Sequence, residues 1–221
     1  MKPEQLAVYF IMGSVNAAGR NPIEVLESAL RGGVTCFQLR EKGPGALKGE
    51  ALLEFATACR DLCREHGVGF IVNDDVDLAV HLGADGLHVG QEDGDIRKIR
   101  SRIGGQMILG VSAHDAGEAG AALAAGADYL GMGPVYGTRS KPDAREASGT
   151  GLIRDAHAAH PDLPIVGIGG IRADNAAPVI RAGASGVSVI SAISHASDPA
   201  RAARELHQAV EEAIMEKERT R

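Results

Sequence analysis

Residues 83–89 read GADGLHV, a glycine followed by a short apolar run. Similar segments recur as GGVTCF at 32–37, GADYLGM at 126–132 and GASGVSV at 183–189. The first residue of each segment is a glycine that suits the left-handed position after a helix, namely Gly32, Gly83, Gly126 and Gly183. The apolar residues that follow are typical of a buried strand. The recurrence predicts one strand–helix unit used again and again.

Eight short apolar runs are the candidate strands of these units. They are Val8–Met12, Cys36–Leu39, Gly69–Val72, Gly86–Val89, Met107–Val111, Tyr129–Met132, Pro164–Ile168 and Gly186–Ile190. Helical patterns lie between them at Ile23–Arg31, Gly49–Glu65, Asp95–Arg102, Ala116–Ala125 and Ala173–Ala182, with Pro199–Met215 as a closing helix. Strands that alternate with helices form a parallel sheet, because each crossover connection needs a helix.

The number of units favours a closed barrel over an open sheet. Eight units in 221 residues fit an α/β protein of the (β/α)₈ TIM-barrel type, with a parallel eight-stranded closed sheet. An open doubly wound sheet is expected to carry GxGxxG after its first strand, and none is present. No linker or charge block divides the chain. We therefore expect residues 1–221 to form a single domain, with the tail after about residue 216 frayed.

Composition excludes several classes of protein. The net charge is −6 and aromatic residues make up 3%, whereas nucleic-acid binders are usually basic and use aromatic platforms. Cys36, Cys59 and Cys63 are expected to be small buried residues in a reducing compartment. We expect no leader segment, since no basic-then-apolar stretch opens the sequence, and no membrane span, since no apolar run approaches the ~18 residues that one needs. We expect a soluble cytoplasmic protein with small-molecule substrates, no nucleic-acid or membrane partner, and an oligomeric state that the sequence leaves open.

Carboxylates follow two neighbouring strands. In a barrel the active site lies at the carboxyl ends of the strands, so the residues just after each apolar run are the candidates. Asp74 follows the third strand and Asp93 the fourth, and adjacent strands are ~4.8 Å apart. Both carboxylates can therefore reach one hard cation such as Mg²⁺, which would share its ligand shell with a diphosphate. Asp75 and Asp77 are instead expected in the first turn of the next helix, where the dipole favours negative charge.

Basic and polar residues follow the other strands. Gln38, Arg40 and Lys42 alternate along the second strand and suit a phosphate, although a salt-bridged surface strand end is the alternative. Ser112 could bind a phosphate or cap the helix near Asp115, and the sequence leaves these equal. His88 lies within a strand. We expect it in the core, or in contact with the metal-binding residues without binding the metal itself.

The loop after the sixth strand, GMGPVYGTRSKPD, places two hydroxyls and a lysine close together. Thr138, Ser140 and Lys141 predict an anion clamp or lid, against the alternative of an ordinary polar loop. Gly169–Gly170 after the seventh strand and Ser191 after the eighth, with Ser194 nearby, fit the position where barrels often bind a phosphate. The residues at the carboxyl ends of the strands therefore predict two anion sites and no nucleophile. This suits a reaction in which diphosphate departs.

At these positions the chain resembles the thiamine-phosphate synthase family. The resemblance runs from about Tyr9 to Ile193 and is carried by QLREK, VNDDVDLA, GLHVGQED, LGVSAH, DYLGMGPVYGTRSK, GIGGI and VSVISAI. It implies a (β/α)₈ transferase of thiamine biosynthesis that condenses a hydroxymethylpyrimidine diphosphate with a thiazole phosphate. Pyrophosphate would be released, with CO₂ when the thiazole is carboxylated, in a dissociative, Mg²⁺-assisted reaction that gives thiamine monophosphate.

The resemblance also implies roles for individual residues. The pyrimidine diphosphate would be held by Gln38, Arg40, Lys42, Asn73, Ser112 and Lys141, of which Arg40, Lys42, Ser112 and Lys141 are the candidate catalytic residues. Magnesium would be held by Asp74 and Asp93, and the thiazole phosphate by Thr138, Ser140, Gly170, Ile190 and Ser191. The chain departs from the family at Gly137, where proline often precedes the threonine of the clamp loop, so this loop is expected to be more mobile.

Two alternatives stay open at this point. A thiazole tautomerase of the same superfamily would keep the phosphate site and use a general acid–base residue, without needing the aspartate pair or the basic residues. A non-catalytic barrel that senses thiamine intermediates would bind the same ligands without turnover. The presence of Asp74, Asp93, Arg40 and Lys141 together argues against the tautomerase.

Overall fold

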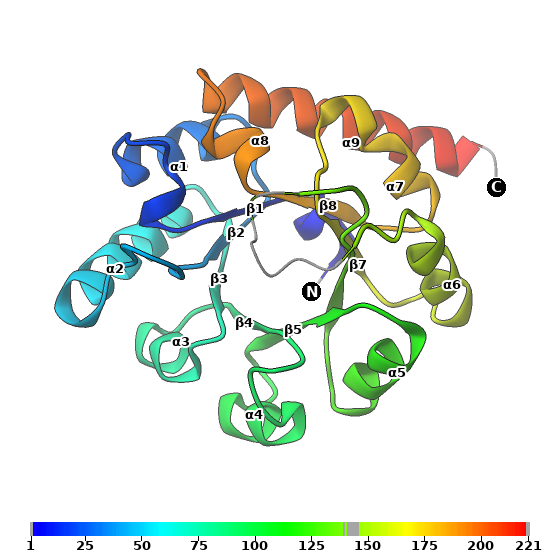
Figure 1. Cartoon of the computed structure of the whole chain (residues 1–221), viewed down its shortest axis with the longest axis horizontal. Helices are drawn as coiled ribbons and strands as arrows, with labels where there is room; N and C mark the ends of the chain where they lie inside the picture. Colours follow the sequence, from blue (N-terminus) through cyan, green and yellow to red (C-terminus); the bar gives the residue numbers. More distant parts are fainter. Residues whose placement is uncertain (1, 139, 141–145, 220–221) are drawn as a thin grey trace.

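The protein is a closed barrel of eight parallel strands surrounded by helices (Figure 1). The structure is a computed structural model that describes residues 2–138, 140 and 146–219. The strands are β1 (Val8–Met12), β2 (Cys36–Leu39), β3 (Gly69–Asn73), β4 (Gly86–Val89), β5 (Ile108–Ala113), β6 (Tyr129–Met132), β7 (Ile165–Ile168) and β8 (Gly186–Val189). Strand β1 pairs with both β2 and β8, which closes the ring. The predicted TIM barrel is confirmed.

The helices form an outer ring. They are α1 (Pro22–Arg31), α2 (Gly49–Glu65), α3 (Val76–Leu82), α4 (Ile96–Ile103), α5 (Ala116–Ala124), α6 (Gly151–Ala159), α7 (Ala177–Arg181), α8 (Ser191–Ser194) and α9 (Pro199–Arg219). Short 3₁₀ turns are η1 (Pro3–Leu6), η2 (Ser14–Asn16) and η3 (Ala173–Asn175). The helix predicted over Ala173–Ala182 is in fact η3 followed by α7, because Pro178 lies in the first turn of α7, where proline is favoured. None of the described helices is both long and apolar enough to cross a bilayer.

The glycines that open the repeats mostly have the predicted backbone. Gly83, Gly126 and Gly183 have φ of 57°, 93° and 119°. The prediction for Gly32 is wrong, because Gly32 has φ −82° and continues α1, whereas Gly33 takes the left-handed conformation at φ 100°. Here the second glycine of the pair ends the helix. Strand β2 therefore begins four residues after Gly32, whereas β4, β6 and β8 begin three residues after the first glycine of their repeats.

Two groups of buried side chains fill the molecule. The larger lies between the strands and the helices, and Cys59 and Cys63 of α2 belong to it. The smaller lies inside the barrel and consists of Leu6, Tyr9, Ile11, Cys36, Ile71, Tyr129, Val166 and Ile190. Because this inner group fills the barrel interior, the space at the carboxyl ends of the strands lies above it.

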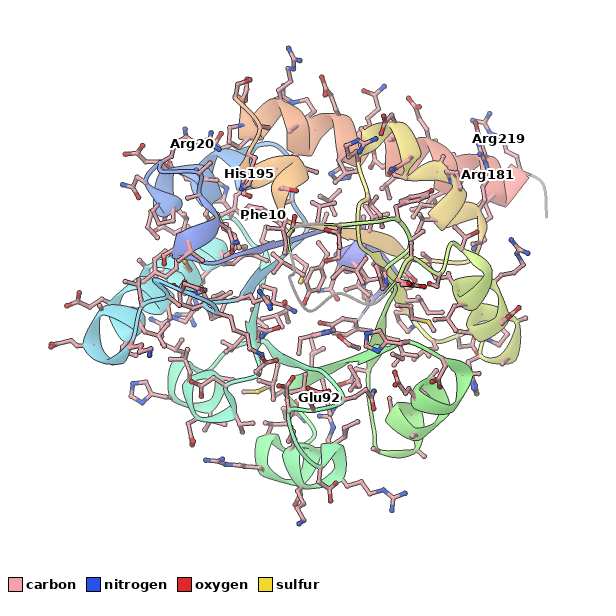
Figure 2. The ribbon with its side chains drawn as sticks, in the orientation of Figure 1. Phe10, Arg20, Glu92, Arg181, His195 and Arg219 are labelled. Atoms are coloured by element: carbon pink, nitrogen blue, oxygen red, sulfur yellow. The ribbon has the colours of Figure 1, made fainter. Side chains whose placement is uncertain are left out.

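The last helix is longer than predicted. Helix α9 continues to Arg219, so the tail is helical beyond the point at which fraying was expected. Arg181 of α7 pairs with Glu216, with Nη2 and Oε2 2.8 Å apart, which ties the end of α9 to the barrel. Arg181 and Arg219 lie at this end of α9 in Figure 2.

Candidate active site

A cavity of about 530 Å³ opens at the carboxyl ends of the strands. Most of the residues predicted to bind substrates or metal line it, and these are Arg40, Lys42, Asn73, Asp74, Asp93, Ser112, Thr138, Ser140, Gly170, Ile190 and Ser191. They come from six different strand ends and one loop. The closed parallel sheet brings them together because every strand ends on the same side of the barrel.

The two aspartates share one cation. Lys42 forms an ion pair with Asp74, and its Nζ lies 3.9 Å from Oδ1 of Asp93. Burial, and then the hydrogen bond with Asp93, raise the pKa of Asp74. Burial alone would raise the pKa of Asp93, but the hydrogen bond with Asp74 and the N–H of Gly90 lower it instead. Two carboxylates this close repel each other when both are ionised, so the pair favours a cation between them.

The backbone at Asp74 is strained. Its φ is 64°, which is unusual for a residue other than glycine. Its own N–H donates to the carbonyl of His88 on β4 at 2.9 Å, which fixes the strand end in this conformation. Strain of this kind persists where the surrounding structure holds it, and it is common at functional sites. The neighbouring Asp75 caps α3 by accepting from the N–H of Leu78 at 2.9 Å, so its predicted structural role is confirmed.

Arg40 is a buried residue whose side chain lines the cavity wall. The residue is 8% exposed, and no ion pair between described residues engages its guanidinium. The next residue, Glu41, points to the other side and accepts from the N–H groups of Ser14 at 2.6 Å and Leu47 at 2.8 Å. The predicted alternation along this strand end is therefore confirmed, with the basic side chains directed at the cavity and Glu41 bracing the loops outside it.

Hydroxyl groups meet on the opposite part of the cavity wall. The Oγ atoms of Ser140 and Ser191 lie 3.0 Å apart, and the N–H of Ser140 donates to Oγ1 of Thr138 at 3.2 Å. The predicted clamp loop thus contacts the end of β8. Ser194, which was named as a further candidate, is buried in α8 and does not line the cavity.

Arg20 holds the short helix that carries Ser191. Its Nη1 donates to the carbonyl of Ala196 at 2.9 Å, and its Nη2 donates to the carbonyl of Ser194. These carbonyls lie at the end of α8, where backbone acceptors have no partner in the helix. Figure 2 shows Arg20 beside His195 at this corner. The contact fixes α8, and with it the position of Ser191.

The adjacent glycines after β7 allow a close backbone approach. Gly169 and Gly170 have φ of 100° and 64°. A Cβ on Gly169 would lie 2.5 Å from Cβ of Pro134, and one on Gly170 would lie 2.5 Å from the carbonyl oxygen of Gly137. Glycine is therefore needed at both positions to pack the loop after β6 against the end of β7.

Ser112 faces the cavity and does not cap a helix. It lies inside β5, and Asp115 caps α5 by accepting from the N–H of Glu118 at 2.8 Å. Its Oγ lies 2.9 Å from Nε2 of His88, and its carbonyl accepts from the side-chain amide of Gln91 at 2.7 Å. The structure thus excludes the capping role, and phosphate binding by Ser112 stays a prediction.

Two predicted residues are not among the described residues that line the cavity. Gln38 is 1% exposed and does not line the cavity, because its Nε2 donates to the hydroxyl of Tyr9 inside the barrel at 2.9 Å. A direct contact of Gln38 with substrate therefore stays a prediction. Lys141 lies outside the described residues, so its position stays a prediction too.

The cavity also has lining residues that the sequence did not single out. Ser188 lies on the wall with its hydroxyl buried and without a hydrogen-bond partner among the described residues. It alternates with Ile190 along β8, and this period of two is a signal that could have identified it. Gln91, two residues after β4, could have been found in the same way as Asp93.

The chain can be compared with known proteins. A family model described as thiamine monophosphate synthase matches residues 8–193. Thiamine-phosphate synthase of Geobacillus thermodenitrificans is 58% identical over 210 residues, covering 95% of this chain and 94% of that protein. The enzyme of the same name from Bacillus velezensis is 55% identical over 210 residues, covering 95% and 93%. The structure of thiamine phosphate pyrophosphorylase from Pyrococcus furiosus superposes with a TM-score of 0.86 at 35% identity, covering 96% and 98%.

Proposed function

The chain belongs to the thiamine monophosphate synthase family, and we propose that it condenses a hydroxymethylpyrimidine diphosphate with a thiazole phosphate to give thiamine monophosphate. Pyrophosphate is the other product, and CO₂ leaves as well when the thiazole is carboxylated. A cytoplasmic location is part of the proposal. The observation that carries it is Arg40, a buried residue that lines the cavity and whose guanidinium has no ion-pair partner among the described residues. A cationic group that faces a cavity without a counter-charge favours an anionic ligand.

The diphosphate is assigned to the wall formed by β2 to β5. Arg40 offers a planar set of donors that matches phosphate oxygens, and Lys42 offers a point charge beside it. Ser112 and Asn73 add a hydroxyl and an amide that line the same wall. Lys141 is assigned here from the sequence motif alone. We expect Lys141→Ala to weaken binding of the diphosphate substrate more than that of the thiazole substrate.

Asp74 and Asp93 are assigned as the residues that hold Mg²⁺. Their fit rests on the shared cation, since the ammonium of Lys42 already pairs with Asp74 and lies 3.9 Å from Asp93. Among the described residues no group of three acidic, histidine or cysteine side chains forms a metal site. Two carboxylates suffice for Mg²⁺ when substrate phosphates supply further oxygens. The ion would neutralise charge on the diphosphate as it leaves.

The thiazole phosphate is assigned to the opposite wall. The hydroxyls of Ser140, Ser191 and Thr138 lie together there, and Gly170 brings backbone close to the same place. Hydroxyl and backbone donors hold a phosphate without adding charge. The two phosphate-bearing substrates can then lie side by side in one cavity.

The reaction needs charge stabilisation and no nucleophile. The carbon–oxygen bond to the diphosphate breaks with its electron pair on oxygen, and the ring nitrogen of the thiazole gives its lone pair to the methylene cation that remains. Arg40, Lys42 and Ser112 stabilise the negative charge that develops on the leaving oxygen. The cavity walls hold the two reacting atoms close together and exclude water that would otherwise capture the cation.

A turnover assay tests this function. The protein is mixed with both phosphorylated precursors and Mg²⁺, and pyrophosphate and thiamine monophosphate are measured together. Product only when both substrates and the metal are present is the expected result. Isomerised thiazole without pyrophosphate would indicate a tautomerase, and binding of both substrates without any product would indicate a sensor; either outcome rejects the proposal.

A further inference from the structure

A chain of hydrogen bonds crosses the inside of the barrel and ends at the cavity. Nε2 of Gln38 donates to the hydroxyl of Tyr9 at 2.9 Å, and the hydroxyls of Tyr9 and Tyr129 lie 2.7 Å apart. The hydroxyl of Tyr129 lies 3.0 Å from Nδ1 of His88, whose Nε2 lies 2.9 Å from Oγ of Ser112. The five side chains come from β2, β1, β6, β4 and β5, so the chain links more than half of the barrel strands.

The neighbouring strands leave space for this chain. Gly110 of β5 lies in register between His88 of β4 and Tyr129 of β6. A Cβ on Gly110 would lie 2.1 Å from Cζ of Tyr129 and 2.5 Å from Nδ1 of His88. A Cβ on Gly131 of β6 would lie 3.1 Å from Cε1 of His88. Any larger residue at Gly110 would displace the two rings, so this contact depends on the sequence of β5.

The order of donors along the chain follows from the number of protons. Burial raises the pKa of both Tyr9 and Tyr129, so each is a neutral phenol with one proton to donate. Because Tyr9 accepts from Gln38, its proton goes to Tyr129. Tyr129 in turn donates to Nδ1 of His88, since its own buried proton would otherwise have no acceptor in this chain.

The same order of donors and acceptors continues at the imidazole of His88. A neutral histidine that accepts at Nδ1 carries its proton at Nε2, so His88 donates to Oγ of Ser112. The proton of the Ser112 hydroxyl is not used within the chain and can point into the cavity. In this direction His88 cannot act as a base toward Ser112, which also argues against Ser112 as a nucleophile.

We propose that Gln38 sets the direction of this hydrogen-bond chain and that His88 thereby presents Ser112 to the cavity as a hydrogen-bond donor for an anionic oxygen of the substrate. The proposal rests on the assignment of Ser112 to the diphosphate wall. Gln38, Tyr9, Tyr129 and His88 are positioning residues in this scheme, because they act through Ser112. In this scheme Gln38 acts by donating to Tyr9 inside the barrel and does not need to contact the substrate.

The tautomer of His88 tests the direction without any turnover. In the protein labelled with ¹⁵N-histidine, nuclear magnetic resonance distinguishes a protonated from an unprotonated ring nitrogen, and the signal of His88 is identified by its loss in His88→Asn. We expect Nε2 to carry the proton and Nδ1 to be unprotonated. A proton on Nδ1 would overturn the proposal even if the protein proves to be a synthase.

A double-mutant cycle tests whether the chain acts through Ser112. Tyr129→Phe removes one hydroxyl and keeps the ring, so we expect kcat/KM for the pyrimidine diphosphate to fall about tenfold in the wild-type background. In the Ser112→Ala background the same change should have little effect, since the group that it positions is absent. An equal loss in both backgrounds would mean that Tyr129 has only a structural role and would reject the proposal.

A second cycle distinguishes an indirect from a direct role of Gln38. Gln38→Met keeps the length of the side chain and removes the donor to Tyr9. We expect its effect on kcat/KM to disappear in the Tyr9→Phe background, where the chain is already broken. An effect that persists there would show that Gln38 contacts the substrate itself, and would overturn the assignment of Gln38 as a positioning residue.

Discussion

The hydroxyls of Ser140 and Ser191 lie 3.0 Å apart although 51 residues separate them in the chain. Ser140 follows β6 and Ser191 follows β8, so their contact closes the clamp loop onto the next-but-one strand. Arg20, from the loop before α1, fixes the far end of α8 and therefore the position of Ser191. Three parts of the chain thus converge on one pair of hydroxyls, which is the arrangement expected for a phosphate held by neutral donors.

Removing one of these hydroxyls should affect one substrate selectively. We expect Ser191→Ala to raise KM for the thiazole phosphate about tenfold, because one hydrogen bond to a charged group is lost. KM for the pyrimidine diphosphate should change little, since that substrate is assigned to the other wall. Steady-state kinetics with each substrate varied in turn measure both values. Equal increases in the two KM values would contradict the division of the cavity into two phosphate sites.

Removing the charge of Asp93 should lower turnover strongly and keep the fold. In Asp93→Asn the amide oxygen can still accept from the N–H of Gly90, which lies 2.7 Å from Oδ2 in the native protein. We therefore expect the free energy of unfolding to change by less than about 1 kcal/mol. The turnover number should fall by about two orders of magnitude or more, because a neutral amide is a poor partner for Mg²⁺.

Asp77→Asn is the matched control for this charge. Asp77 is exposed on α3 and pairs with Arg102, an interaction worth at most about 1 kcal/mol at a surface. This control should retain full activity. If Asp93→Asn also keeps near-normal turnover at low Mg²⁺ concentration, the assignment of Asp93 to the metal is wrong.

The strands were predictable because their sequence carries two signals at once. Apolar runs such as Tyr129–Met132 and Gly86–Val89 follow a helix-ending glycine, and both agree with the observed bounds. Helix α6 was not among the predicted helices; it follows the long loop after β6, and no side chain caps its first turn. The split of the helix predicted over Ala173–Ala182 shows how Pro178 overrides an apolar period.

The site was predictable where a side chain follows a strand directly. Asp74, Asp93 and Ser191 lie at strand ends, and the barrel carries them to one cavity. The role of His88 could not be read from the sequence, because it depends on which strand becomes the neighbour of β4 and on the space left by Gly110. These contacts join residues of β4, β5 and β6, so they depend on how the three strands are aligned in the sheet. No local sequence pattern specifies that alignment.

The three thiols should be unreactive in the folded protein. Cys36, Cys59 and Cys63 are completely buried, and burial raises the pKa of Cys63 from 9.0 to about 12. Thiolate is the reactive form, so we expect no reaction with an aromatic disulfide reagent at pH 8 in the native state and reaction of all three thiols in guanidinium chloride. Rapid modification of any thiol in the native protein would contradict the buried assignment.

The same shift makes a prediction about stability at high pH. The folded-state pKa of Cys63 is raised, so its contribution to stability is fully present below pH 9 and is lost as pH rises toward about 12. The unfolded chain releases the thiol proton first, which favours unfolding over this range. Denaturant titrations of the wild type and of Cys63→Ala between pH 8 and pH 11 should show a steeper loss of unfolding free energy in the wild type.

Gly170 should be needed for its shape as well as its backbone angle, and Gly149 provides a control that separates the two. Both have nearly the same positive φ, 64° and 65°, but a Cβ on Gly149 meets no atom within 4 Å, whereas one on Gly170 lies 2.5 Å from the carbonyl oxygen of Gly137. The backbone term alone should cost each alanine variant about 1 kcal/mol of unfolding free energy. Gly170→Ala must also displace the loop before Thr138, so it alone should raise KM for the thiazole phosphate. If Gly149→Ala raises that KM equally, the close packing of the clamp loop on β7 is not what positions the phosphate.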